Sequence, residues 1–258
     1  MEYNEEWEPL FEEDYKLDFI VDPFSFMRYR VFDLNEAWDA FIKGFRGNGK
    51  SSVALSCCLL LNPRLLDMSP AKALERCWCF TTEERNEKAR QVKRGDVLAF
   101  DEQGTQKGGS SYKWQDATNQ DYADEKQLDR TDGVINLGIS LDEMRVLKRI
   151  RQLYRVEIYP EVKLSNRDTK GNGMAIDCIV REVVENPFGD TENERFKKKY
   201  FNYAPKGRIS RVRIPHPPAD IWQEYSRRRE EFKESLRDEA APMVRGSRQE
   251  LFQQAAGF

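Results

Sequence analysis

The chain is short of several residue types and patterns on which common kinds of site and compartment depend. Histidine occurs once, as His216 between two prolines, so neither a histidine base nor a histidine-rich zinc site is expected. The number of cysteines, five, is odd, and the acidic N-terminal stretch is unlike a secretory signal. No disulfide framework is therefore expected. No apolar run approaches the ~18 residues of a membrane-spanning helix. These absences predict a cytoplasmic protein without membrane insertion.

An excess of charge of one sign is also lacking. The 258 residues carry a net charge of −3, so the chain as a whole does not have the basic signature of a nucleic-acid-binding protein. A chain of this length can bury the core of one large domain, or of one domain with appendages.

What the sequence does contain is a complete phosphate-binding loop at residues 44–51, Gly-Phe-Arg-Gly-Asn-Gly-Lys-Ser. It matches the pattern G-x-x-x-x-G-K-[ST], in which glycines let backbone N–H groups turn toward phosphate oxygens. Lys50 can reach the β- and γ-phosphates of a nucleotide, and the Ser51 hydroxyl can ligate Mg²⁺. The residues predicted to bind the nucleotide here are Gly44, Arg46, Gly47, Asn48, Gly49, Lys50, Ser51 and Ser52.

A second motif lies about fifty residues downstream, where the apolar segment 95–101 ends in Asp101 and Glu102. This pattern is typical of a Walker B strand. Asp101 is then expected to hold Mg²⁺, directly or through water, and Glu102 to orient and deprotonate the attacking water. The alternative is a solvated acidic pair at a strand end, which the complete loop upstream disfavours.

Alternating strand and helix patterns predict the fold class. The expected strands are 37–44, 76–80, 95–101, 134–140 and 154–159, and the expected helices are 49–61, 81–92, 116–130 and 141–149. This order implies an α/β fold with a mainly parallel sheet and helices on both faces, and a ligand at the carboxyl ends of the strands, where Ser140 falls. The segment 62–73 is expected to be a loop. Cys77 and Cys79 are expected on one face of their strand, and all the cysteines are expected to be small buried residues.

The remaining segments suggest additions to this core. A hairpin of strands 161–165 and 174–185, an edge strand near 208–214 and a charged helix over 219–240 are expected. That helix carries an apolar stripe of Ile221, Tyr225, Phe232 and Leu236. We therefore divide the chain into an acidic, aromatic lead segment (1–36), a nucleotide-binding core (37–165), a hairpin and edge-strand extension (166–218), and a C-terminal helix and tail (219–258).

The order of these motifs resembles one family. The phosphate loop, then "LLLNPRLLD", "CWCFTTEE", "GDVLAFDEQG", "VINLGIS" and "LKRIRQLYRVEI", is similar to the FtsK/HerA-type ATPases. The similarity is closest to ATPases of archaeal viruses and plasmids and to zonular-occludens-toxin-like proteins. It covers about residues 37–165 and, more loosely, "WQEY" in the C-terminal helix. The resemblance implies a RecA-like P-loop core that binds ATP and Mg²⁺, assembles into a homo-oligomeric ring, often hexameric, and moves double-stranded DNA.

The resemblance also assigns site residues. Lys50 and Ser51 match the Walker A pair, and Asp101 and Glu102 match the Walker B pair. Ser140 stands where the family has a polar sensor, commonly glutamine. Arg130 is the candidate for the arginine that stabilises transition-state charge, with Arg149 and Arg151 as rivals supplied to a neighbouring subunit.

Two functions from different classes follow. The first is an ATPase that couples hydrolysis to DNA translocation, as in packaging or conjugation; its candidate DNA contacts are Lys163, Arg167, Lys170 and the triplet 227–229. The second is a nucleotide-binding scaffold or switch in a virion, secretion or membrane complex. For the arginine triplet, the alternative is a solvated helix face balanced by Glu230 and Glu231. A GTPase is disfavoured because 166–169 lacks the guanine-reading Asp, and a small-molecule kinase because 103–115 lacks lid arginines.

Overall fold

The computed structural model describes residues 23–28, 30–31, 38–45, 47–101, 133–141, 152–161, 175–185, 196–199, 201–203, 207–209 and 211–236. The helices are α1 (Pro23–Arg28), α2 (Lys50–Leu61), the short 3-10 helix η3 (Pro63–Asp67), α3 (Pro70–Cys77) and α4 (Thr82–Ala89). A further helix over 219–236 is called the C-terminal helix below. The strands are β1 (Asp39–Lys43), β2 (Trp78–Cys79), β3 (Val97–Phe100), β4 (Ile135–Ser140), β5 (Tyr154–Glu161), β6 (Ala175–Glu185), β7 (Phe196–Lys199), β8 (Phe201–Tyr203), β9 (Gly207–Ile209) and β10 (Arg211–Pro215).

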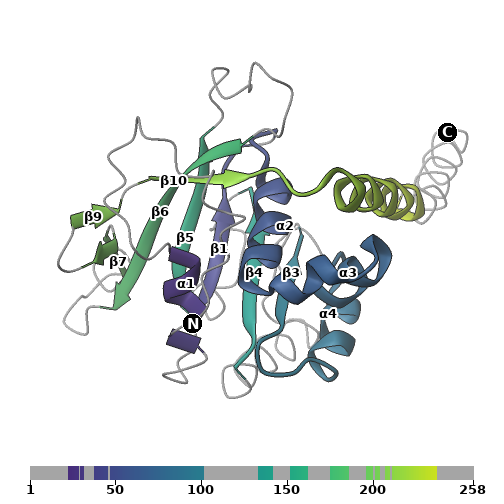
Figure 1. The fold of residues 1–258 in the computed structure, drawn as a ribbon, viewed down its shortest axis with the longest axis horizontal. Helices are drawn as coiled ribbons and strands as arrows, with labels where there is room; N and C mark the ends of the chain where they lie inside the picture. The colour runs from purple at the N-terminus through teal and green to yellow at the C-terminus, as the bar shows by residue number, and fades with distance from the viewer. Residues whose placement is uncertain are drawn as a thin grey trace, which may run out of the picture.

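The main sheet is mixed, with its parallel strands grouped together (Figure 1). Its order is β10-β6-β5-β1-β4-β3-β2, and β7 also pairs with β6. Strands β5, β1, β4, β3 and β2 run parallel, while β6 is antiparallel to both β5 and β10. Strand β1 therefore lies inside the sheet, between β5 and β4, and the loop that follows it leaves from the middle of the carboxyl edge.

Buried side chains alternate between the two faces of this sheet. In β3, Val97 and Ala99 join the core beneath α2, while Leu98 and Phe100 join the core on the opposite face, where Ala89 at the end of α4 also packs. The period of two is that of a strand buried on both sides. Helices thus cover both faces, and the predicted α/β fold with a mainly parallel sheet is confirmed.

Helix α2 is apolar around almost its whole circumference and lies at the centre of the larger core. Its buried residues include Val53, Leu55 and Leu59, and it ends at Asn62 because Pro63 cannot continue the helix. Phe24 and Met27 of α1 belong to the same buried cluster. On its other flank, the Ser56 hydroxyl donates to the Pro215 carbonyl of β10 at 2.6 Å.

The segment between α2 and β2 differs from the sequence prediction. The expected loop 62–73 contains η3 and the first half of α3, and the expected strand 76–80 is reduced to β2. Pro70 stands at the first position of α3, where the fixed φ of proline favours helix initiation. Cys77 ends this helix, so Cys77 and Cys79 do not share a strand face; they are buried in the two different core clusters.

The hairpin beyond the parallel strands is present, with one change. Strand β5 runs without a break from Tyr154 to Glu161 and itself pairs with β6, so the expected strand 154–159 forms the first arm of the hairpin. The rest of the expected strand 161–165 lies outside the described residues. Strand β10 forms the expected edge strand on β6. The predicted helix 116–130, and the predicted helix 141–149 beyond Leu141, lie outside the described residues.

The C-terminal helix follows β10 and lies at the other end of the sheet, beside α3 (Figure 1). Ile221 and Tyr225 are buried, and the ring of Phe232 stacks on Phe80 with centroids 5.2 Å apart. Leu236 is 43% exposed, so the predicted apolar stripe is shorter than expected. Among the helices that the structure describes, none has the length and apolar character needed to span a bilayer.

Candidate nucleotide site

The loop after β1 has the backbone shape that anion binding requires. Gly47 and Gly49 have φ of 87° and 75°, in the left-handed region that favours glycine. Gly49 is also the N-cap of α2, so no side chain at that position competes for the N–H groups of the first helical turn. These N–H groups and the positive end of α2 are therefore available to phosphate oxygens.

Lys50 brings its charge back over the same loop. Its Nζ atom donates to the Gly44 carbonyl at 2.9 Å and to the Phe45 carbonyl at 2.8 Å. These two carbonyls, which bear only partial charges, help to hold the ammonium group at the loop. A phosphate offers a full negative charge and can replace these carbonyls as the acceptor.

Ser51 and Asp101 come together across the site. The Ser51 hydroxyl donates to Asp101 Oδ2 at 3.3 Å, and Asp101 is only 4% exposed. Asp101 follows β3 directly, while Ser51 lies in the first turn of α2, so the meeting requires the parallel sheet to place β3 close to β1. A carboxylate and a hydroxyl are hard oxygen donors of the type that Mg²⁺ takes, so the residues present fit this ion.

A third residue joins this pair from the C-terminal helix. The Tyr225 hydroxyl donates to the same Asp101 oxygen at 2.9 Å. Burial, and then the negative charge of Asp101, raise the pKa of Tyr225 well above its ordinary value, while the Ser51 hydrogen bond and the charge of Arg229 act in the opposite direction. The phenol therefore keeps its proton and remains a donor. The sequence indicates Tyr225 only as part of an apolar stripe. The signal for its contact with Asp101 is that a tyrosine at a buried position needs a polar partner for its hydroxyl.

Two further predicted residues lie close by. Ser140 ends β4, is buried, and is the register partner of Lys43, the residue before the loop. Because β4 lies between β1 and β3, Ser140 stands between the loop and Asp101 along the sheet edge. The Ser52 hydroxyl is buried and makes no hydrogen bond within the described part of the chain, which leaves it able to take a ligand oxygen.

Strands β5 and β6 supply a wall that the sequence did not reveal. A Cβ atom at Gly44 would lie 3.5 Å from the Tyr159 ring, and one at Gly49 would lie 2.5 Å from Ile176 Cδ1. Tyr159 comes from β5, within the predicted core, and Ile176 from β6, in the predicted hairpin extension. The loop is thus packed from one side by residues more than a hundred positions downstream.

Several predicted residues fall outside the described part of the chain. They are Arg46, Glu102, Arg130, Arg149, Arg151, Lys163, Arg167 and Lys170, together with the loop 103–115. Their roles stay predictions.

The arginine triplet of the C-terminal helix is largely engaged by carboxylates. Arg227 pairs with Glu224 at 2.7 Å and with Glu231, and Arg228 pairs with Glu224 at 2.9 Å. Arg228 also donates to the Ala71 carbonyl at 2.8 Å. These contacts match the balanced helix face, with Glu224 as a further carboxylate partner; the expected Glu230 pairs with Lys233.

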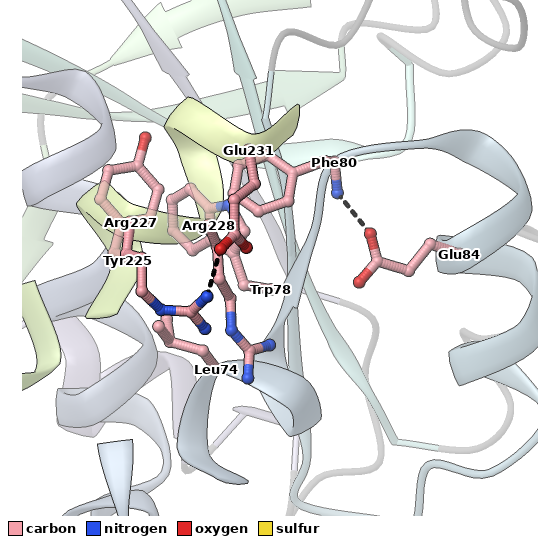
Figure 2. A pocket seen from close by; sticks show the side chains of 8 residues that line it. All are labelled: Leu74, Trp78, Phe80, Glu84, Tyr225, Arg227, Arg228 and Glu231. Carbon is pink, nitrogen blue, oxygen red and sulfur yellow. Dashed lines mark hydrogen bonds and ion pairs between the residues drawn. The ribbon is translucent and has the colours of Figure 1, made fainter. Parts of the chain in front are cut away.

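A pocket of about 360 Å³ lies where this helix meets α3, β2 and α4 (Figure 2). Its lining residues are Leu74, Trp78, Phe80, Glu84, Tyr225, Arg227, Arg228 and Glu231. Figure 2 shows the Tyr225 ring in this lining and the ion pair of Arg227 with Glu231. The ring of Tyr225 therefore packs where the C-terminal helix meets the body of the protein, and its hydroxyl donates to Asp101.

Two solved structures are similar to this chain in fold. One is the N-terminal domain of zonular occludens toxin from Neisseria meningitidis, 13% identical, with a TM-score of 0.34 over 55% of this chain and 83% of that chain. The other is the genome packaging NTPase B204 from Sulfolobus turreted icosahedral virus 2 in complex with AMPPCP, 8% identical, with a TM-score of 0.33 over 62% of this chain and 95% of that chain. No protein-family model and no curated protein sequence matches the chain. At these identities and TM-scores, neither likeness assigns a ligand, an activity or a partner to this chain.

Proposed function

We propose that this protein binds Mg²⁺–ATP at the loop 44–51 and hydrolyses it. The observation that carries the proposal is the contact of Ser51 with Asp101, 3.3 Å apart across fifty residues of sequence. It brings together the two chemical groups, a helix-terminal hydroxyl and a buried strand-end carboxylate, that a magnesium–nucleotide site requires.

Each residue has a separate task in this proposal. The loop N–H groups and Lys50 bind the phosphates, and Ser51 and Asp101 would hold Mg²⁺. The bound ion would supply positive charge to the phosphate oxygens. Glu102, which directly follows Asp101, is the proposed base that takes the proton of the attacking water, and Arg130 the proposed stabiliser of transition-state charge.

We further propose that the ATPase is a motor of the FtsK/HerA type that acts on double-stranded DNA as a ring. The support for assembly is local. Phe45, in the loop itself, is 75% exposed, and Leu141, just after β4, is 43% exposed. Large apolar side chains at the nucleotide edge suit a neighbouring subunit that packs across the site.

The test is ATP hydrolysis by the purified protein with and without double-stranded DNA. Wild-type turnover that rises with DNA, and falls to background in Glu102→Gln and in Lys50→Ala, supports the motor. If Lys50→Ala hydrolyses ATP at the wild-type rate, the assignment of the site is contradicted.

A second candidate is a nucleotide-dependent scaffold or assembly switch in a viral or secretion complex. The observation in its favour is the charge pattern: the net charge is −3, and Arg227 and Arg228 already pair with carboxylates of their own helix. ATP binding with negligible turnover, with or without DNA, would favour this candidate over the motor.

A further inference from the structure

The Tyr225 hydroxyl and the Ser51 hydroxyl converge on one oxygen of Asp101. The distances to Oδ2 are 2.9 Å from Tyr225 and 3.3 Å from Ser51. Tyr225 lies on the C-terminal helix, 124 residues beyond Asp101, and no sequence motif connects the two. The carboxylate is therefore oriented by a residue that lies outside both nucleotide motifs.

The position of this hydroxyl is fixed by the packing of its ring. Tyr225 is 1% exposed, its ring stacks on Trp222 with centroids 5.0 Å apart, and the edge of Trp78 meets it at 4.9 Å. Phe80 stacks at 6.1 Å. Aromatic neighbours on several sides leave the ring little freedom, so the hydroxyl is presented to Asp101 in one place.

A buried carboxylate that binds a metal depends on its other hydrogen bonds. These bonds hold the ligand oxygen in the orientation that the ion requires, and their loss typically lowers metal affinity about 10- to 100-fold. Tyr225 is the phenol that makes this bond to Asp101. We infer that Tyr225 is a positioning residue for Mg²⁺ at the proposed ATP site, and that it ties the C-terminal helix to occupancy of that site; the inference rests on the proposed function.

Reciprocity follows from this connection. If the docked helix favours the metal-binding orientation of Asp101, then the bound metal–nucleotide favours the docked helix by the same factor. The helix is held to the body by Tyr225 and its aromatic neighbours, and by Arg228 through the Ala71 carbonyl. Binding of Mg²⁺–ATP is therefore expected to protect residues 219–236.

The test compares wild type, Tyr225→Phe and a matched control, Tyr154→Phe. The first variant keeps the ring and removes only the hydroxyl. The control removes a hydroxyl from a buried ring at the start of β5, which packs against Phe41 at 5.0 Å on the opposite face of the sheet. Binding of a fluorescent ATP analogue is measured in EDTA and over a Mg²⁺ titration, and amide hydrogen exchange of 219–236 is measured with and without Mg²⁺–ATP.

We expect Tyr225→Phe to shift the Mg²⁺ midpoint upward by about 10- to 100-fold, with nucleotide binding in EDTA within about twofold of wild type. The protection of 219–236 by Mg²⁺–ATP is lost in Tyr225→Phe and retained in Tyr154→Phe.

A Mg²⁺ midpoint for Tyr225→Phe within about twofold of wild type overturns the inference while leaving the proposed ATP site intact. Equal weakening in EDTA and in Mg²⁺ also overturns it, because the effect is then a general loss of structure. If the wild-type protein binds no nucleotide in EDTA or in Mg²⁺, the proposed function is contradicted, and this inference, which rests on it, is contradicted too.

Discussion

Ile176 of β6 lies directly over Gly49, the residue at which the phosphate loop becomes helix α2. A Cβ atom at Gly49 would lie 2.5 Å from Ile176 Cδ1, whereas one at Gly47 would meet nothing within 4 Å. Both glycines have positive φ, 75° and 87°. The two positions thus share a backbone constraint and differ in a steric one.

Gly49→Ala is expected to weaken nucleotide binding and to lower the free energy of unfolding more than Gly47→Ala does. Each alanine costs about 1–2 kcal/mol for its left-handed backbone, and only Gly49→Ala also displaces Ile176. Urea unfolding and ATP-analogue binding measure the two effects. Ile176→Val lacks Cδ1, so the double variant Gly49→Ala/Ile176→Val should recover to the level of Gly47→Ala; no recovery would contradict the steric account.

Acid is expected to release the ion pairs of the C-terminal helix. Hydrogen bonds from Arg227 and Arg228 lower the pKa of Glu224 from 4.5 to about 2. A depressed carboxyl pKa stabilises the folded state fully above the unfolded value of about 4.3, and this contribution is lost as the pH falls toward 2. The unfolding free energy of Glu224→Gln should therefore lie below that of wild type at pH 6 and converge with it near pH 2, as urea titrations at each pH would show. A constant difference across that range would rule out the linkage.

Thiol chemistry should detect only unfolding. All five cysteines are buried, and burial raises the pKa of Cys79 to about 12 and that of Cys57 further still. The thiolate is the reactive form, so a thiol reagent such as DTNB should react with none of them in native protein at pH 8 and with all of them in denaturant. Rapid native reaction of even one thiol would show that part of this core opens.

A buried carboxylate at the amino edge of the sheet is expected to contribute strongly to stability. Asp39 Oδ1 accepts from the Asn136 backbone N–H at 2.8 Å and from Asn136 Nδ2 at 3.3 Å. Asp39→Ala leaves these donors buried without this acceptor and should cost about 2–3 kcal/mol in urea unfolding. Asp67 is exposed at the end of η3, so Asp67→Ala serves as the control and should stay within about 0.5 kcal/mol of wild type. If both changes lower the unfolding free energy equally, the hydrogen bonds from Asn136 to Asp39 do not account for the loss.

The parts of the fold that follow from sequence are those with a strong local signal. Helix α2 and strands β3 and β4 are apolar runs bounded by glycine, proline or acidic residues, and they lie where expected. Helix α3 is not predicted because Pro63 and Pro70 favour a loop in this segment, and only Ala73, Leu74 and Cys77 are buried in it, too few residues to reveal a helical period. Strand β2 is shorter than the expected strand 76–80 because α3 extends through Cys77.

The candidate site divides in the same way. Residues 44–51 are recognisable because phosphate binding fixes the spacing of the glycines, lysine and serine within the loop. Asp101 is recognisable because it directly follows an apolar strand. Tyr225, Tyr159 and Ile176 approach the loop only through β5, β6 and the C-terminal helix, and nothing in the sequence near 50 specifies those approaches. Long-range packing of this kind depends on the whole sheet order.

The distance of Tyr225 along the chain from the residues it completes has a consequence for synthesis. At the usual elongation rates, the 124 residues that separate Asp101 from Tyr225 take about 6 to 25 s to make. During that interval a nascent chain carries the phosphate loop and Asp101, while Trp78 and Phe80 lack the aromatic cover that Tyr225 later gives them. The growing polypeptide therefore exposes an aromatic surface beside an incomplete nucleotide site. Hydrophobic surface exposed in this way during folding promotes aggregation and is the kind of surface that chaperones bind.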